Sequence, residues 1–173
     1  MLGARYVVYI HDDLISELWV DAGIISAKGC RDVHLLESAV SRPFQTVFGG
    51  DAYPTILDKG AALFHSLIAN HPFHDGNKRT AVTAFYAFLL GNGYYFALSN
   101  EETYLLAKAT ASYRERGLTH ENALSEIRDG VRDWIVPFSD LSTGATFNRT
   151  FQTAKKLRLT LRKSKLNRLV DPL

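Results

Sequence analysis

The sequence predicts an all-α fold: a compact helical bundle with one short flap and a basic C-terminal extension. Three observations lead to this class. Apolar residues recur at helical spacing through most of the chain, residues able to cap helices precede several of these stretches, and Gly or Pro follows them. A chain of 173 residues favours one domain with a real core. We expect residues 1–138 to form this domain and residues 139–173 to form the extension.

The first elements are expected before residue 43. Residues 6–10 suggest a short strand or an extended lead-in, and Asp12 or Asp13 is then predicted to cap a helix. The apolar face of that helix would contain Leu14, Ile15, Leu18 and Trp19. Asp32 is the next predicted N-cap, and Arg42-Pro43 ends the helix that follows it, because proline disfavours a helical residue before it.

A flap and two long helices are expected in the middle of the chain. Phe48-Gly49-Gly50-Asp51 contains residues that favour a turn, and residues that favour β-strands flank it. We therefore predict a small hairpin or flap within residues 44–53. Pro54-Thr55 opens a helix with apolar residues at helical spacing. Residues 81–90 are apolar on nearly every face, which is typical of a central buried helix, and Gly91-Asn92-Gly93 ends it.

Two further helix starts are predicted toward the C-terminus. Ser99 and Glu102 have the spacing of a capping box, in which each side chain accepts a hydrogen bond from the other residue's backbone N–H. Thr119 precedes another apolar stripe and is the predicted N-cap of the last helix of the domain. The body is therefore expected to be helical as far as Pro137.

The C-terminal extension differs in charge from the rest. The first 140 residues hold 12 Lys/Arg and 17 Asp/Glu, a net charge of −5, whereas the last 33 hold 8 and 1, a net charge of +7. Residues 156–162 alternate apolar and polar, a strand signal, and a helix from Thr150 onward is the competing interpretation. The charge is compatible with a solvated tail, with docking on an acidic surface or with nucleic-acid contact, although Phe147 and Phe151 are its only aromatic residues for stacking.

Cysteine content and hydropathy narrow the expected location. Cys30 is the only cysteine, so an intrachain disulfide is excluded and a reducing compartment is favoured. The sequence shows no signal peptide, and no apolar run approaches the ~20 residues that a membrane span needs. We therefore expect a cytoplasmic protein without a membrane partner.

The densest group of polar residues is His71-Pro72-Phe73-His74-Asp75-Gly76-Asn77-Lys78-Arg79-Thr80, directly before the apolar run. A helix that begins there would offer unpaired N–H groups and a partial positive charge, which suit phosphate. His71 titrates near neutral pH, so it can accept a proton from a hydroxyl. Asp75 is a hard oxygen donor, suited to a Mg²⁺ ion that a nucleotide also ligates.

The remaining motif residues suit binding rather than proton transfer. Gly76 lets the backbone approach a ligand, and with Asn77 and Lys78 it presents N–H groups to phosphate. Lys78 and Arg79 add positive charge, Arg79 as a planar fork that matches phosphate oxygens. Phe73 is apolar among polar groups and is expected to anchor the loop in the core. Together these are the parts needed for group transfer from a nucleotide.

Two other interpretations stay open at this point. Each of these residues alone is more often structural, and the cluster could belong to a binding module without catalysis. His71, His74 and Asp75, with His65 upstream, could instead gather round a transition metal, and His74-Asp75 resembles the paired dipeptide of the HD phosphohydrolases. Further ligands would have to come from His34, Asp129 or Asp133, which no spacing singles out.

At these residues the chain resembles the Fic/Doc family, and within it the death-on-curing (Doc) toxins. Residues 71–79 match the family motif H-x-F-x-D/E/N-G/A-N-G/K-R at every position. Residues 31–43, 53–55 and 91–94 also resemble the corresponding Doc-like segments. The likeness covers roughly residues 6–136 and leaves out the basic tail.

The resemblance implies a compact all-helical Fic fold, with the motif spanning a loop and the start of the next helix. It implies His71 as the general base toward a target hydroxyl and Asp75 as the Mg²⁺ ligand. The nucleotide phosphates would be held by Asn77, Lys78, Arg79 and the backbone around Gly76. The flap would position a target chain in extended form.

Lys78 decides which reaction the resemblance implies. Most Fic enzymes have Gly at this position and a second Arg three residues after the first, and they transfer AMP; here the second Arg is replaced by Val82. Doc-like toxins share the lysine, bind the nucleotide reversed and act as kinases. The resemblance therefore implies transfer of the γ-phosphate of ATP to a Ser or Thr hydroxyl, with elongation factor Tu as the family's target and AMP transfer as the alternative.

The resemblance also bears on regulation. Self-inhibited Fic proteins carry the motif S/T-x-x-x-E-G/N. Glu121-Asn122 is the only Glu followed by Gly or Asn here, and position 117 is Gly, so the chain encodes no such motif. The resemblance instead implies an antitoxin in trans, whose disordered segment would fold on binding.

Overall fold

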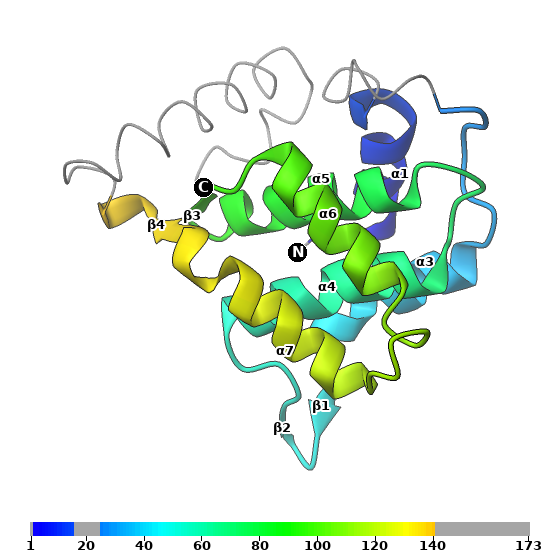
Figure 1. Ribbon diagram of the computed structural model, residues 1–173. Coiled ribbons are helices and arrows are strands. Elements are labelled where there is room, and N and C mark those ends of the chain that lie inside the picture. The colour runs from blue at the N-terminus through cyan, green and yellow to red at the C-terminus, as the bar shows by residue number, and fades with distance from the viewer. Residues whose placement is uncertain (1, 16–24, 141–173) are drawn as a thin grey trace.

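The computed structural model describes residues 2–15 and 25–140 and shows a mostly helical chain (Figure 1). The N-terminal part contains α1 (Ala4–Tyr9), the π-helical turn η1 (Ile10–Leu14), α3 (Val33–Ser41) and the 3-10 turn η3 (Arg42–Phe44). The long helices are α4 (Ile56–Asn70), α5 (Asn77–Gly91), α6 (Asn100–Ala111) and α7 (His120–Val131), followed by the 3-10 turns η4 (Arg132–Trp134) and η5 (Phe138–Asp140). Short strands form two antiparallel ribbons, β1 (Thr46–Val47) with β2 (Gly50–Asp51) and β3 (Tyr94–Phe96) with β4 (Ile135–Pro137). The predicted all-α class is confirmed.

The N-terminal segment corrects one prediction. Residues 6–10 are helical rather than extended, and the helix begins at Ala4 rather than after Asp12 or Asp13. Val7 and Ile10 are wholly buried and three positions apart, which is helical spacing. A five-residue apolar run is too short for periodicity to distinguish helix from strand, which is why the prediction of an extended segment was wrong. Leu18 and Trp19 lie outside the described residues.

The predicted helix caps are confirmed where local chemistry specified them. Asp32 caps α3, since its carboxylate accepts a hydrogen bond from the Leu35 N–H at 3.1 Å. Thr119 caps α7 in the same way. Full capping boxes begin α4, between Thr55 and Asp58, and α6, between Ser99 and Glu102.

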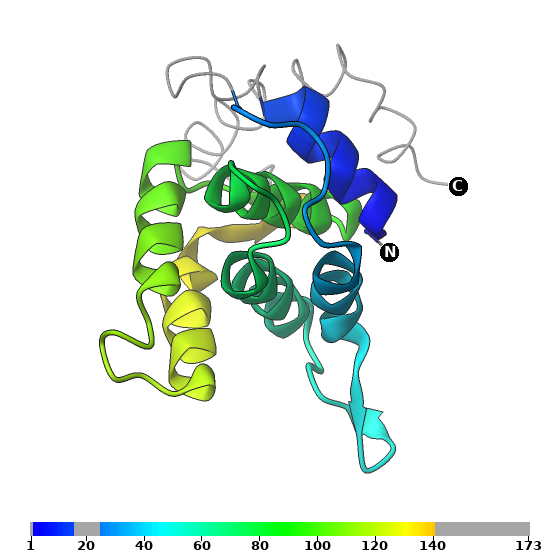
Figure 2. The same cartoon turned by 90° about the vertical axis from the view of Figure 1, so that its right-hand side faces the viewer.

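Helices α4 and α5 form the centre of the molecule. Figure 2 shows them side by side, with α1 and α3 on one flank and α6 and α7 on the other. The predicted burial of α5 is confirmed, since its side chains from Thr80 to Tyr86 are all buried. The largest fully buried side chains in these two helices are Leu63, Phe64, Leu67, Ile68, Phe85 and Leu89.

A glycine allows α4 and α5 to approach closely. A Cβ atom on Gly60 would lie 2.8 Å from Cε2 of Phe85, closer than side chains tolerate. Phe85 is itself 1% exposed and has no room to retreat. The packing of the two helices that carry the motif therefore depends on the absence of a side chain at this position.

The predicted flap is a β-hairpin that projects from the helical body (Figure 1). Thr46 pairs with Asp51 and Val47 with Gly50, and Phe48 and Gly49 form the turn, both with positive φ. The hairpin leads into the first turn of α4, whereas the motif follows its last turn. A helix of 15 residues is ~22 Å long, so this length of helix separates the hairpin from the motif.

Two further expectations concern membrane spans and the C-terminal tail. No helix in the described ranges is long and apolar enough to cross a bilayer. Residues 141–173 lie outside the described residues, so the choice between strand and helix for the tail stays a prediction, as does the domain boundary at residue 138.

Candidate active site

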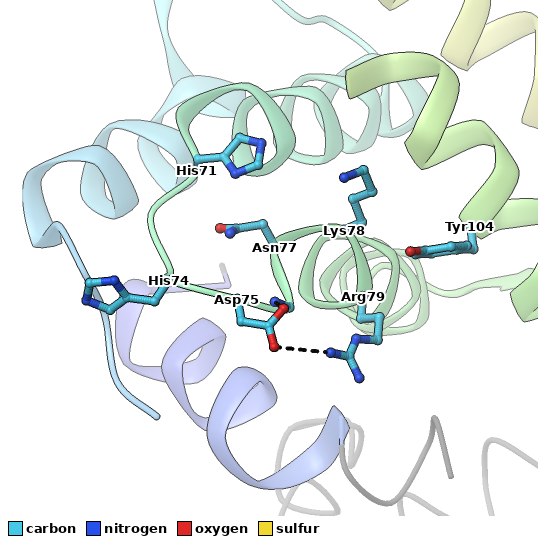
Figure 3. A pocket seen from close by; sticks show the side chains of 8 residues that line it. His71, His74, Asp75, Asn77, Lys78, Arg79 and Tyr104 are labelled. Atoms are coloured by element: carbon cyan, nitrogen blue, oxygen red, sulfur yellow. Dashed lines mark hydrogen bonds and ion pairs between the residues drawn. The ribbon is translucent and has the colours of Figure 1, made fainter. Parts of the chain in front are cut away.

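The motif forms one wall of an open pocket at the N-terminus of α5 (Figure 3). Its volume of about 350 Å³ is in the range of small-molecule sites. The lining residues are His71, His74, Asp75, Gly76, Asn77, Lys78, Arg79 and Tyr104. The fold thus gathers the residues that the sequence singled out and adds a tyrosine from α6.

His71 ends α4 in a left-handed backbone conformation, with φ of 48°. Such a conformation is uncommon for a residue other than glycine and costs free energy unless its surroundings hold it. The Arg31 side chain donates a hydrogen bond to the His71 carbonyl at 2.6 Å and supports this turn. Partial burial, Lys78 and Arg31 together lower the pKa of the His71 imidazole, so the ring is neutral at neutral pH and can accept a proton.

Asp75 presents an ionised carboxylate. Its Oδ2 accepts hydrogen bonds from the Ser26 N–H and hydroxyl, both at 3.2 Å, and its Oδ1 accepts from the Gly76 N–H at 2.6 Å. These backbone hydrogen bonds lower the pKa of Asp75, with a further contribution from Arg79, whose Nη2 lies 3.7 Å from Oδ2. The side chain is 40% exposed, so it remains accessible to a ligand.

Gly76 and Asn77 shape the loop before α5. Gly76 has φ of 71°, a conformation that favours glycine, and a Cβ there would also make a tight contact of 3.1 Å with Ile25. The Asn77 side chain accepts from the Phe73 N–H at 2.9 Å and donates to the Phe73 carbonyl at 2.8 Å. Because this amide is committed within the loop, any contact of Asn77 with phosphate falls to its backbone N–H.

Phe73 lies beneath the loop and is 1% exposed. Its backbone forms an isolated β-bridge with Cys30, and the carbonyl of the preceding Pro72 accepts from the N–H groups of Arg31 and Asp32. The segment before α3 therefore holds the first half of the motif in place.

The two cations of the motif point to different sides of the pocket. Lys78 extends toward the side on which His71 lies, and Arg79 lies beside Asp75 (Figure 3). The Arg79 side chain is only 11% exposed. Val82, one turn further along α5, is wholly buried in the core. The pocket therefore carries the positive charge of Lys78 on the His71 side and that of Arg79 on the Asp75 side.

Sequence reasoning missed several residues that shape this site. Ser26 binds the Asp75 carboxylate, and Tyr104 lines the opposite wall from α6. His11 and Asp12 lie behind the loop, where His11 is wholly buried and bonded to the Asp75 carbonyl. A histidine beside Ile10 on a buried helical face would have been noticed if the helix had been predicted from Ala4.

The structure does not assemble the ligands that an HD-like metal site requires. His65 faces away from the motif and packs against Tyr113 and His120, at ring-centroid distances of 4.9 and 4.4 Å. His74 lies at the outer edge of the loop and points away from Lys78 and Arg79 (Figure 3). Within residues 2–15 and 25–140, no group of three or more His, Cys, Asp or Glu side chains is placed to hold a metal ion.

Comparison with known proteins places this site in a family. Residues 2–89 match the model of the Fic/DOC family. A curated relative, described as Toxin Doc from Mycolicibacterium smegmatis, is 57% identical over 63 residues, which cover 36% of this chain and 48% of the relative. The matched region thus spans about half the length of that relative. No solved structure matches the chain.

Proposed function

This chain belongs to the Fic/DOC family, and on that premise we propose that it is a Doc-like toxin of a toxin–antitoxin system. Its proposed reaction transfers the γ-phosphate of ATP to a Ser or Thr hydroxyl of a target protein, with elongation factor Tu as the candidate target and a block of translation as the result. The observation that carries the proposal is the pocket at the N-terminus of α5, where a neutral imidazole, an ionised carboxylate and two cations meet.

His71 is the proposed general base. Its ring accepts the proton of the target hydroxyl as the hydroxyl oxygen forms a bond to the γ-phosphorus. The bond between that phosphorus and the β,γ-bridging oxygen breaks, and ADP leaves with the bonding electrons. The lowered pKa of His71 supports this role, because the base must be neutral before it can accept a proton.

The residues present fit a Mg²⁺–nucleotide complex. Mg²⁺ in nucleotide sites is held by one or two carboxylates together with phosphate oxygens, and Asp75 supplies one exposed, ionised carboxylate. When bound, the ion would neutralise charge on the phosphate oxygens. Lys78, Arg79 and the first-turn N–H groups of α5 would hold the phosphates, a task that suits an N-terminal helix turn.

Lys78 and Val82 support phosphate transfer over AMP transfer. A lysine side chain occupies space and adds charge where a glycine would leave the cradle open for the phosphate arrangement of AMP transfer. Val82 is buried, so the next turn of α5 offers no second cation. Both features match the kinase-like Doc branch rather than the AMP-transferring Fic enzymes.

Labelled ATP distinguishes the two reactions. Purified protein is incubated with elongation factor Tu, Mg²⁺ and ATP labelled at either the α- or the γ-phosphate, and the mass of the modified target is measured. We expect label from the γ-phosphate only, and a mass increase of one phosphate. Label from the α-phosphate with an adenylate mass would establish AMP transfer and reject the role assigned to Lys78.

His71→Ala is the matched control for catalysis. The variant retains Lys78 and Asp75, so nucleotide binding is expected to persist while target modification and growth arrest on expression are lost. Equal toxicity of wild type and variant would reject catalysis as the cause of toxicity. A translation factor as target would place the activity in the cytoplasm, and an antitoxin acting in trans is the proposed regulator.

A further inference from the structure

His11 is a buried histidine with two hydrogen-bond contacts. It lies in the turn η1 with 0% exposure. Its Nδ1 is 2.6 Å from Oδ1 of Asp12, and its Nε2 is 3.0 Å from the backbone carbonyl oxygen of Asp75. The two nitrogens are thus held by groups from separate parts of the chain, which fixes the orientation of the His11 ring.

Asp12 has the environment of a permanent carboxylate. Partial burial opposes ionisation, but hydrogen bonds from the Gly29 N–H, at 2.8 Å, and from His11 lower the pKa of Asp12 below its usual value. Asp12 thereby connects two segments. One is the helix that carries His11, and the other is the loop that carries Ser26, which itself binds the Asp75 side chain.

The His11 ring forms the floor of the motif loop. It stacks on Phe73 with a centroid distance of 4.0 Å and an interplanar angle of 5°. It also lies under Gly76, where an added Cβ would be 3.5 Å from its Cδ2 and Nε2. The helix that carries His11 runs beside the loop that carries Asp75 (Figure 3). The His11 side chain thus contacts Phe73, the backbone of Asp75 and Gly76, the N-cap of α5.

We propose that His11 and Asp12 are a positioning pair that fixes the Asp75 peptide, and through it the phosphate-binding end of α5. His11 is wholly enclosed beneath the loop and Asp12 bonds to it from behind, so the pair acts on the pocket through the loop. The ligand, Mg²⁺–ATP, rests on the function proposed above. The effect of the pair on the order of the loop does not depend on that function, so it can be tested without any nucleotide.

Hydrogen exchange of the free protein tests the pair directly. His11→Phe keeps an aromatic ring against Phe73 but removes both ring nitrogens that bond Asp12 and the Asp75 carbonyl. We expect the amides of Phe73, Gly76 and Thr80, which are hydrogen-bonded within the loop and the start of α5, to exchange about tenfold faster, while those of α7 keep their wild-type rates. His34→Phe, whose wild-type side chain is 96% exposed on α3, is the matched control and should change neither region. Unchanged exchange at Phe73, Gly76 and Thr80, or an equal increase throughout α7, would overturn the inference.

Nucleotide affinity then connects the pair to the pocket. Loss of a residue that orients a metal ligand typically weakens metal binding about 10–100-fold, and we expect a loss of this size in Mg²⁺–ATP affinity for His11→Phe. Because Asp12 bonds both His11 and the Gly29 N–H, Asp12→Ala alone should cost several-fold in affinity, and the double variant should lose less than the two single losses combined. Fully additive losses would reject the coupling of the two residues.

A more conservative variant keeps the test valid if the larger substitutions unfold the protein. Asp12→Asn keeps the volume and an acceptor oxygen for the Gly29 N–H but removes the negative charge beside His11. We expect the same direction of change in exchange and in affinity, with smaller size. Failure of the wild-type protein to bind Mg²⁺–ATP would reject the proposed function alone, since the exchange result would still decide the role of His11.

Discussion

At the scale of single residues, the chemistry of the pocket depends on the charge state of His71. The ring lies at the mouth of the pocket with Lys78 and Arg31 nearby, and both cations disfavour its protonation. Lys78 therefore has two effects in this site. It adds positive charge for phosphate, and it keeps the proposed base neutral to a lower pH than an isolated histidine would be.

Lys78→Ala is predicted to raise the pKa of His71. Removing one cation leaves partial burial and Arg31 as the remaining causes of the lowered value, so the pKa moves back toward the ordinary 6.5. His71 would then become protonated at a higher pH than in wild type and could no longer accept a proton there. Activity at pH 6 would therefore fall more than activity at pH 8. An NMR titration of the His71 ring in the free protein measures the shift without interference from phosphate binding.

Lys28→Ala provides the control for this prediction. Lys28 is 71% exposed and paired with Asp13, so its removal takes away the same charge from another part of the surface. The His71 titration should be the same as in wild type. An identical His71 pKa in the Lys78 variant and in wild type would show that Lys78 does not influence the base.

At the scale of secondary-structure elements, the contact between α4 and α5 places the motif. The two helices carry the residues on either side of the loop, and they pack at the centre of the molecule. Gly60 lies in this contact, where an added Cβ would meet the rings of Phe85 and Phe88. Gly130 in α7 is instead exposed, and Leu106 lies at an ordinary contact distance of 3.6 Å from an added Cβ.

Gly60→Ala is predicted to destabilise the fold although alanine favours helices. The gain in helix propensity is about 1 kcal/mol, but overpacking against a buried aromatic ring costs about 1–3 kcal/mol. We expect a net loss of up to about 2 kcal/mol in the free energy of unfolding, measured by urea denaturation. Gly130→Ala meets no such contact and should stabilise by about 0.5–1 kcal/mol. Stabilisation by both variants would mean that α4 and α5 are not packed as described.

At the scale of the whole molecule, a buried histidine connects stability to pH. His65 on α4 is 2% exposed and lies against Tyr113 and His120, on the flank formed by α6 and α7. Burial, followed by the neighbouring His120, Arg42 and Arg114, lowers its pKa to about 4. Its Nε2 has no hydrogen-bond partner within the described residues, so no acceptor there stabilises a protonated ring.

The folded protein is predicted to lose stability as the pH falls from 6.5 toward 4. In this window the unfolded chain binds a proton at His65 that the folded protein does not, so acid favours unfolding. The contribution is about 3 kcal/mol across the full window. His65→Phe removes the titrating group and should flatten the pH dependence of the free energy of unfolding by that amount. The same steep pH dependence in the His65 variant would assign the effect to other groups.

The sequence alone determined the features that depend on neighbouring residues. Asp32, Thr55, Ser99 and Thr119 cap helices through groups three positions away, so their chemistry is visible in any short window. The flap hairpin and the central helix followed from equally local patterns. The motif from His71 to Arg79 pointed to the family because its spacing is specific, and the family model matches the chain there.

Only the tertiary structure decided how the motif is supported. The contact between His11 and Asp75 joins residues 64 positions apart, and that between Ser26 and Asp75 joins residues 49 positions apart. The inward direction of the Asn77 amide, and the arrival of Tyr104 from α6, also depend on how helices pack. Periodicity and capping describe one element at a time, whereas these contacts exist only after separate elements have come together, so no local pattern in the sequence specifies them.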